Sequence, residues 1–121
     1  NTDWKVYLSR ENNGDFEISR AGWIGDYQDP KTFLDMMVSG RGNNKTGWSN
    51  PEYDSLLIKA SQATSQEQRY AYLYEAEKIL IDELPIIPIY TYTRIYMKHE
   101  SVKGWEPNLL DSHPYQYISI E

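Results

Sequence analysis

The sequence predicts an α/β chain of mixed α+β type, and three patterns point to it. Several segments begin with a side-chain cap and continue with apolar residues at helical spacing. Other segments are rich in aromatic and β-branched residues that follow the two-residue period of strands. Proline and glycine separate the two kinds of segment. No internal repeat or low-complexity tract interrupts this order.

The first 23 residues predict a short helix followed by a strand. Thr2 or Asp3 can cap the helix, and Gly14 ends it. The apolar residues of this helix share one face: Trp4, Tyr7 and Leu8. In the range 15–23 apolar and polar residues alternate, which predicts a half-buried strand.

Two further helices, about 30–38 and about 51–63, are predicted from matching starts. Each start has a capping side chain followed by proline at the first helical position: Asp29-Pro30 and Asn50-Pro51. Gly40 ends the first of them. The expected apolar faces are Phe33, Met36 and Met37 in the first helix, and Tyr53, Leu56, Leu57 and Ala60 in the second.

The longest helix is predicted over about 66–83. Ser65 opens it with a capping-box pattern, and Pro85 terminates it. Its buried stripe is expected to consist of Leu73, Ala76, Leu80 and Leu84. Its acidic residues are expected to face solvent: Glu75, Glu77, Asp82 and Glu83.

Two β-rich runs follow the last predicted helix. The run 86–97 has no polar side, which suggests that both of its faces are covered. The run 115–120 resembles a closing strand. The last twenty or so residues have little support from the rest of the chain, as if they paired elsewhere.

Composition limits the class of protein. The net charge is −6 without a Lys/Arg cluster, which argues against nucleic-acid binding. Cysteine is absent, so disulfides and thiolate chemistry are excluded, and no run approaches the ~20 apolar residues of a membrane span. Apolar residues make up 40% of the chain, but 11 of its residues are tyrosine. This scarcity of aliphatic side chains fits an aromatic ligand surface, a piece that packs against further protein, or both.

Asp26 is the leading candidate for a functional residue. It lies in a glycine-containing turn next to Tyr27 and close to Trp23, and aromatic walls lower the dielectric around a carboxylate that meets a cation. The structural alternative is an Asx-turn or a cap. Trp23 either stacks on a ligand or fills a core. Asp29, directly before Pro30, is predicted to be a helix cap.

The two arginines of the N-terminal part have open roles. Arg20 follows the parity of Phe16 and Ile18, so its stem is expected on the buried or cleft side. A guanidinium there needs an anion, either an internal Asp or Glu or a ligand carboxylate. Arg10, on the first helix, is otherwise simply solvated.

Catalytic, metal and cofactor sites find little support in the sequence. The two histidines, His99 and His113, lack metal-site spacing, so no metal and no cofactor are expected. No nucleophile elbow or phosphate loop is present. Carboxylates for glycoside cleavage would have to combine Asp26 with one of three acids that nothing distinguishes: Asp3, Asp35 or Asp54. A hydrolase is therefore the weakest of the hypotheses.

Three segments in order resemble the C-terminal part of the family-5 extracellular solute-binding proteins, the oligopeptide- and dipeptide-binding receptors of ABC importers. They are 20–30 (RAGWIGDYQDP), then Asn44 with 48–57 (WSNPEYDSLL), then Arg69 with 74–80 (YEAEKIL) and 84–90 (LPIIPIY). The ranges 102–105 (VKGW) and 118–121 (ISIE) fit the tail of that family. The resemblance covers essentially the whole chain.

The resemblance implies a C-terminal lobe fragment of a two-lobed, periplasmic-binding-protein-like fold without catalytic activity. Residues 1–98 would form the ligand-binding portion of one lobe, and residues 99–121 would cross back to pair with the first lobe. The implied partners are a peptide ligand and the permease subunits of an ABC transporter, in an extracytoplasmic location, as a periplasmic protein or a cell-surface lipoprotein. Whether this piece forms a homo-oligomer through its exposed inter-lobe face stays open.

The resemblance also implies roles for site residues. Asp26 would pair with the α-ammonium group of a peptide, and the backbone of Gly22, Trp23 and Ile24 would bind the peptide main chain as an added strand. Arg20 and Arg10 occupy places where a peptide carboxylate can bind, and Tyr27 would wall the site. The alternatives are a nickel-complex binder or a carbohydrate binder whose stacking platforms would be Trp23, Trp48, Tyr90 and Tyr92.

Overall fold

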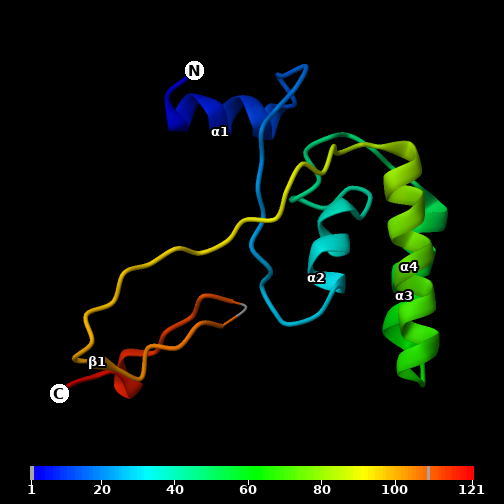
Figure 1. Cartoon of the computed structure of the whole chain (residues 1–121). Coiled ribbons are helices and arrows are strands. Elements are labelled where there is room, and N and C mark those ends of the chain that lie inside the picture. Colours follow the sequence, from blue (N-terminus) through cyan, green and yellow to red (C-terminus); the bar gives the residue numbers. More distant parts are fainter. Residues whose placement is uncertain (1, 109) are drawn as a thin grey trace.

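The computed structural model describes residues 2–108 and 110–121 and contains four helices and one small sheet in that part of the chain (Figure 1). α3 and α4 lie side by side with α2 next to them, whereas α1 stands apart. The elements in chain order are α1 (Trp4–Asn13), α2 (Lys31–Leu34) with the 3-10 turn η1 (Asp35–Met37), α3 (Pro51–Gln62), α4 (Gln66–Glu83), β1 (Val102–Lys103), the 3-10 turn η2 (Tyr115–Tyr117) and β2 (Ser119–Ile120).

The core lies where α2, η1, α3 and α4 meet. Tyr53 is fully buried there, and its hydroxyl donates a hydrogen bond of 2.6 Å to the carbonyl oxygen of Leu34. Burial raises the pKa of Tyr53, so this hydroxyl keeps its proton well into alkaline conditions. The buried apolar residues are Leu34, Met37, Tyr53, Leu57, Ala60, Leu73, Ala76 and Leu80.

The capped helix starts of the sequence are confirmed. Asp3 accepts a hydrogen bond from the backbone of Lys5 at the start of α1. Asn50 accepts from two backbone N–H groups of α3, and Ser65 accepts from one in α4. These bonds satisfy N–H groups that have no partner within the helix. The predicted bounds of α1, α3 and α4 therefore hold to within one or two residues.

One prediction at the C-terminal end of α4 is wrong. Leu84 is 53% exposed because it leaves the helix with a left-handed φ of 47°, which turns its side chain away from the buried stripe. Glu83 is exposed, as predicted, and its two carboxylate oxygens also accept 2.7 Å hydrogen bonds from Trp48 and Asn50. Glu83 thereby ties the end of α4 to the start of α3.

The predicted helix 30–38 is shorter than expected. α2 has only four residues before the backbone tightens into η1, which is a frequent ending for a helix. The predicted apolar face is also rotated, because Leu34 and Met37 are buried while Phe33 is 52% exposed.

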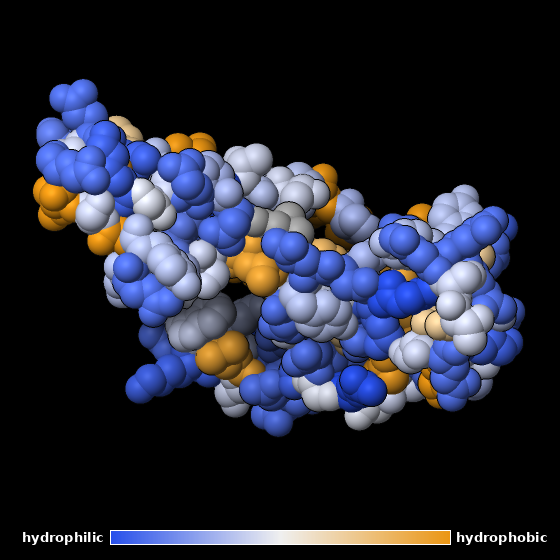
Figure 2. Space-filling model, turned by 90° about the horizontal axis from the view of Figure 1, so that it is seen from below, coloured by the Kyte–Doolittle hydropathy of each residue, from blue (hydrophilic) through white to orange (hydrophobic). Residues whose placement is uncertain are grey.

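The predicted strands 15–23 and 86–97 do not form in the described structure. Apart from bends at Glu17, Ile18 and Ile86, both segments are irregular and have no neighbouring strand, and a strand needs one to satisfy its backbone groups. Ile18 and Ile95 are 91% and 92% exposed, so neither the half-buried strand nor the doubly covered run is present. Figure 2 shows apolar side chains scattered over the surface of one face of the molecule.

The C-terminal segment folds back on itself. β1 and β2 pair antiparallel, with Val102 opposite Ile120. Gly104 is required at the turn after β1, because its φ is 77° and a Cβ atom there would overlap the carbonyl oxygen of Tyr117. The predicted strand 115–120 is correct only at its end, since η2 occupies Tyr115–Tyr117.

Candidate functional site

Asp26 lies in an irregular turn between the extended segment and α2, and its side chain is exposed. Its backbone N–H donates a 2.9 Å hydrogen bond to Oγ1 of Thr32. Among the residues that the structure describes, none forms a hydrogen bond or ion pair with the Asp26 carboxylate. The Asx-turn alternative is therefore absent from this turn, and the carboxylate is available to a ligand.

Asp29, in contrast, is bonded through one of its two carboxylate oxygens. Its Oδ1 accepts a 2.9 Å hydrogen bond from the backbone N–H of Lys31, which confirms the predicted helix cap. The same oxygen accepts a 2.7 Å bond from Nη2 of Arg69, on α4. The hydrogen bond from Arg69 lowers the pKa of Asp29, against the opposing effect of desolvation. Asp29 therefore stays ionised and holds the turn to α4.

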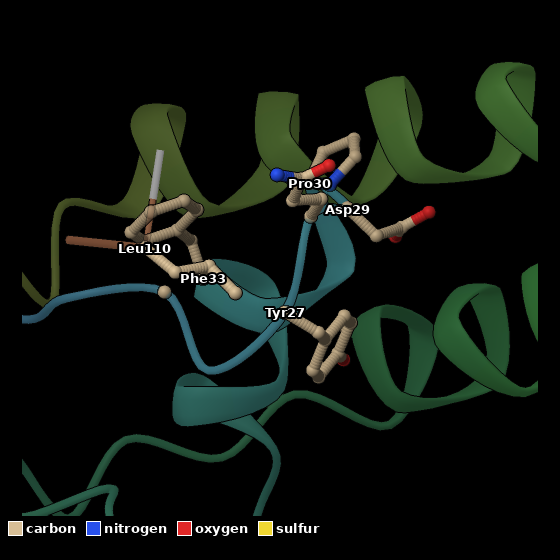
Figure 3. A pocket seen from close by; sticks show the side chains of 7 residues that line it. Tyr27, Asp29, Pro30, Phe33 and Leu110 are labelled. Atoms are coloured by element: carbon tan, nitrogen blue, oxygen red, sulfur yellow. The ribbon is translucent and has the colours of Figure 1, made fainter. Parts of the chain in front are cut away.

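Tyr27 lies between the two aspartates and faces a small hollow of about 250 Å³. Its hydroxyl donates a 3.1 Å hydrogen bond to Asp35, and desolvation is the main cause that raises the pKa of Tyr27. Phe33 and Leu110 line one side of the hollow, whereas the carboxylate of Asp29 points away from them (Figure 3). Asp26 is not among the residues that line this hollow.

A second hollow, of about 510 Å³, lies between α1 and the extended segment. Arg20, Gly22 and Trp23 line it from the extended segment, and the aromatic rings of Trp4 and Tyr7 line it from α1. The structure thus brings three of the predicted site residues to one hollow. Tyr27 lies at the other hollow.

The backbone from Gly22 to Ile24 is extended and open. Within the described chain, no hydrogen bond involves the N–H or C=O groups of Gly22, Trp23 or Ile24. Trp23 and Ile24 are 36% and 56% exposed. An extended backbone with unpaired groups has the form that an added peptide strand requires.

Arg20 has an internal partner, but this partner is a tyrosine and not an Asp or Glu. Nη2 of Arg20 donates a hydrogen bond to the hydroxyl of Tyr92, and the guanidinium lies 6.0 Å from the centre of that ring. This contact joins the extended segment before Asp26 to the one after α4. The neutral hydroxyl of a tyrosine does not compensate the positive charge of Arg20, whereas a carboxylate would.

Arg10 is separate from this arrangement. Its Nε donates a 3.1 Å hydrogen bond to the carbonyl oxygen of Asp15 and lies 3.3 Å from the carboxylate of the same residue. Both side chains are more than half exposed. Arg10 lines neither hollow, so the structure does not bring Arg10 and Arg20 together.

The residues proposed for other chemistries have structural partners. Trp48 packs edge-on against Tyr53 beside the core, so it is not an open stacking platform. The three acids considered as partners of Asp26 each bind locally: Asp3 caps α1, Asp35 pairs with Lys31, and Asp54 accepts from the backbone of Ser39. In residues 2–108 and 110–121 no three acidic or histidine side chains group as metal ligands.

Three contributors to the site were not singled out for it by sequence reasoning. Thr32 binds the backbone of Asp26, Arg69 binds Asp29, and Leu110 lines the smaller hollow. Arg69 and Asp29 are 40 residues apart, so no local pattern connects them. Thr32 carried one signal, since it is a polar residue close to a glycine-containing turn, where hydroxyls often bind backbone N–H groups.

Comparison with models of known protein families gave no match. Individual proteins match closely, however. The dipeptide-binding protein DppE of Bacillus subtilis is 36% identical over 121 residues, which are 100% of this chain and 21% of DppE. The oligopeptide-binding protein OppA of Bacillus subtilis is 42% identical over 86% of the chain and 19% of its own length. The periplasmic murein peptide-binding protein MppA of Escherichia coli is 40% identical over 89% of this chain and 20% of its own length.

Solved structures of such proteins have the same fold. OppA of Burkholderia pseudomallei superposes with a TM-score of 0.91 at 30% identity and covers 100% of this chain with 24% of its own. The murein tripeptide-binding protein MppA of Escherichia coli has a TM-score of 0.90 at 37% identity, over 99% of this chain and 24% of its own. OppA of Haemophilus influenzae, in complex with the peptide RPPGFSPFR, has a TM-score of 0.88 at 33% identity, over 99% of this chain and 24% of its own.

The fold and these matches define the class as the solute-binding proteins, with the chain forming part of one. The chain belongs to the solute-binding proteins of family 5, as the resemblance of its motifs led us to expect. It spans about one fifth of the length of its curated relatives, in agreement with a C-terminal fragment of a two-lobed fold.

The relatives also bear on location. MppA and OppA of Escherichia coli are periplasmic, which supports the expected extracytoplasmic placement. Over the described ranges of the chain, every helix is too short or too polar to cross a membrane.

Proposed function

We propose that this chain is a non-catalytic ligand-binding part of a substrate-binding protein that delivers oligopeptides or dipeptides to an ABC importer. Its relatives carry the names dipeptide-binding and oligopeptide-binding protein, and one is solved with a bound nonapeptide. Because the chain matches only about a fifth of each relative, the activity belongs to a longer, two-lobed receptor.

One observation carries the proposal: an unpaired carboxylate stands directly after an extended backbone with unpaired groups. Asp26 provides the carboxylate, and Gly22 to Ile24 provide the backbone. A peptide has the complementary features, a positively charged α-amino end followed by a main chain of alternating donors and acceptors. The ammonium would bind Asp26 while the main chain adds a strand beside Trp23.

The exposed aromatic and cationic groups around this segment complete the proposed site. Trp23 would cover the bound peptide, and Tyr27 would close the side of the turn. Arg20, whose charge has only a tyrosine partner, would receive a peptide carboxylate when the ligand is short enough. Arg10, already paired with Asp15, is not assigned a ligand.

Competing functions lack such complementarity. A glycosidase needs a second carboxylate free to act, and the three candidates are each bound to a structural partner. Of the aromatic side chains considered as sugar platforms, Trp48 is packed against Tyr53, and the two Bacillus subtilis relatives are named for peptides. No observation favours a nickel complex, so peptide transport is the single function that we propose.

The proposal extends to the surroundings of the chain. Residues 99–121 would cross to the first lobe, and the receptor would dock on the permease subunits of its transporter outside the cytoplasm. The exposed isoleucines of the run 86–97 would be covered by the other parts of the receptor. In the isolated piece the same inter-lobe face would favour a homo-oligomer.

Titration calorimetry on the intact receptor with a pentapeptide tests the proposal. Asp26→Asn should weaken binding by about 3–5 kcal/mol, because the ligand ammonium is left enclosed without a counter-charge. N-terminal acetylation of the peptide should cost the wild-type receptor a similar amount and the variant little.

Asp15→Asn is the matched control, since Asp15 is also an exposed aspartate in the N-terminal part but is paired with Arg10. It should bind the peptide like the wild type. Equal affinities of the wild type and Asp26→Asn would remove Asp26 from the anchoring role.

A further inference from the structure

Thr32 connects the turn of Asp26 to the helical core. It is 3% exposed and is the one buried polar residue among those the structure describes. Its Oγ1 accepts the 2.9 Å hydrogen bond from the backbone N–H of Asp26. A backbone bond of this kind fixes the direction in which the Cα–Cβ bond of Asp26 leaves the turn. The carboxylate itself remains unbonded and can meet a ligand.

Gly25 lets the turn approach Thr32 this closely. A Cβ atom on Gly25 would lie 3.1 Å from Cγ2 of Thr32 and 3.3 Å from Cζ of Phe33, which is tighter than ordinary contact. The backbone before Asp26 is therefore packed directly on α2. Contact and hydrogen bond together hold this end of the turn.

The other end of the turn is held from α4. Asp29 binds the backbone of Lys31 and the guanidinium of Arg69 through the same oxygen, at 2.9 Å and 2.7 Å. The side chains of Asp29 and Arg69 are each 25% exposed, so solvent competes with this pair less than with a surface pair. Tyr27, between the two anchored positions, bonds to Asp35.

We propose that Thr32 is a positioning residue that aims the Asp26 carboxylate at the peptide ammonium, with the Asp29–Arg69 pair as its counterpart at the far end of the turn. This inference rests on the proposed function. It assigns the selectivity for the charged N-terminus of the peptide to Asp26 together with the buried hydroxyl of Thr32 on α2. Preorganisation of the anchor lowers the ordering cost that binding would otherwise have to meet.

The test compares a free pentapeptide with its N-acetylated form on the intact receptor, by calorimetry. The ratio of the two affinities isolates the ammonium contact from the remaining contacts. Thr32→Val keeps the shape of the side chain but removes the acceptor, and should lower the ratio by roughly threefold to tenfold, the value of one hydrogen bond. Thr32→Ser restores the hydroxyl and should restore most of the ratio.

Thr46→Val is the matched control. Oγ1 of Thr46 also accepts a backbone hydrogen bond, from Trp48 at 3.1 Å, but in a loop remote in sequence from Asp26. This variant should leave the ratio unchanged. A variant that merely destabilised the lobe would weaken both peptides alike, and thermal unfolding measured in parallel identifies that case.

The outcomes separate the two proposals. If the wild-type receptor does not distinguish the free from the acetylated peptide, the ammonium anchor itself is wrong, and this inference with it. If the wild type distinguishes them and Thr32→Val retains the full ratio, the anchor stands and the positioning role of Thr32 is overturned. Loss of the ratio in Thr32→Val with recovery in Thr32→Ser supports the role.

Discussion

The helical part of the chain and its extended segments differ in how far they bury their apolar side chains and bond their backbone groups. α2, α3 and α4 bury their apolar faces against one another, and side chains cap the starts of α3 and α4. In the described residues, the segments 15–24 and 85–99 have no neighbouring strand, and they expose large apolar side chains. Both parts belong to one chain of 121 residues, but among the described residues only the first forms a buried apolar core.

This difference separates residues that support the fold from residues that are available to bind a ligand. A carboxylate that is bonded internally is less available to a ligand, as Asp29 illustrates with two hydrogen bonds to one of its oxygens. Asp26, three residues earlier, is anchored only through its backbone. The proposed site therefore lies where the extended segment meets the helical part. There, residues with internal hydrogen bonds hold groups that lack such bonds in place.

The largest effect should come from the centre of the helical part. Tyr53→Ala removes a fully buried ring and its hydrogen bond to Leu34, and should lower the free energy of unfolding by about 3–5 kcal/mol. Urea unfolding followed by circular dichroism measures it. The matched control is Tyr90→Ala in the extended segment, where the ring is 64% exposed, and its effect should stay within about 0.5 kcal/mol.

Similar losses for Tyr53→Ala and Tyr90→Ala would break the comparison. They would mean that the extended segment is packed as firmly as the helices. A loss confined to Tyr53→Ala would identify the helical part as the source of stability.

The sequence predicted the helical part well, because its signals are local. Asn50, Ser65 and the apolar spacing of α3 and α4 act within a few residues of one another. The strands were predicted less well for the same reason. The alternation in 15–23 and the apolar run 86–97 indicate which side chains are expected to be buried. A strand also needs a neighbouring strand, and the residue pattern does not identify one.

The site shows the same division. Asp26 and the open backbone at Trp23 were recognisable from residue type, glycine spacing and family motif. The anchors were not, because the bonds of Asp26 to Thr32 and of Asp29 to Arg69 depend on how the turn packs on α2 and α4. The partner of Arg20 is another case, since the hydroxyl of Tyr92 comes from a segment 72 residues away.

A moderate effect is expected where the two parts are joined by Asp29 and Arg69. Arg69→Gln should lower the free energy of unfolding by about 1 kcal/mol near neutral pH. The pKa of Asp29 is lowered in the folded state, so the pair stabilises the fold above the ordinary aspartate pKa of about 3.9 and loses its effect as pH falls through the folded value. Urea unfolding at neutral and at acidic pH should therefore show the two proteins converge in acid.

A difference that persisted in acid would contradict this assignment. The contribution of Arg69 would then come from packing of its stem and not from the charge of Asp29.

The smallest effect in the chain alone should be that of Ile95→Ala. Ile95 is 92% exposed, so its truncation should change the free energy of unfolding of this chain by less than about 0.5 kcal/mol. In the intact receptor the same substitution should cost about 2 kcal/mol or more, because we propose that the run 86–97 is covered there. Thermal unfolding of both forms measures the two values. Equal small effects in both would mean that the run stays exposed, and the scarcity of aliphatic side chains in this chain would then reflect a ligand surface and not a missing partner.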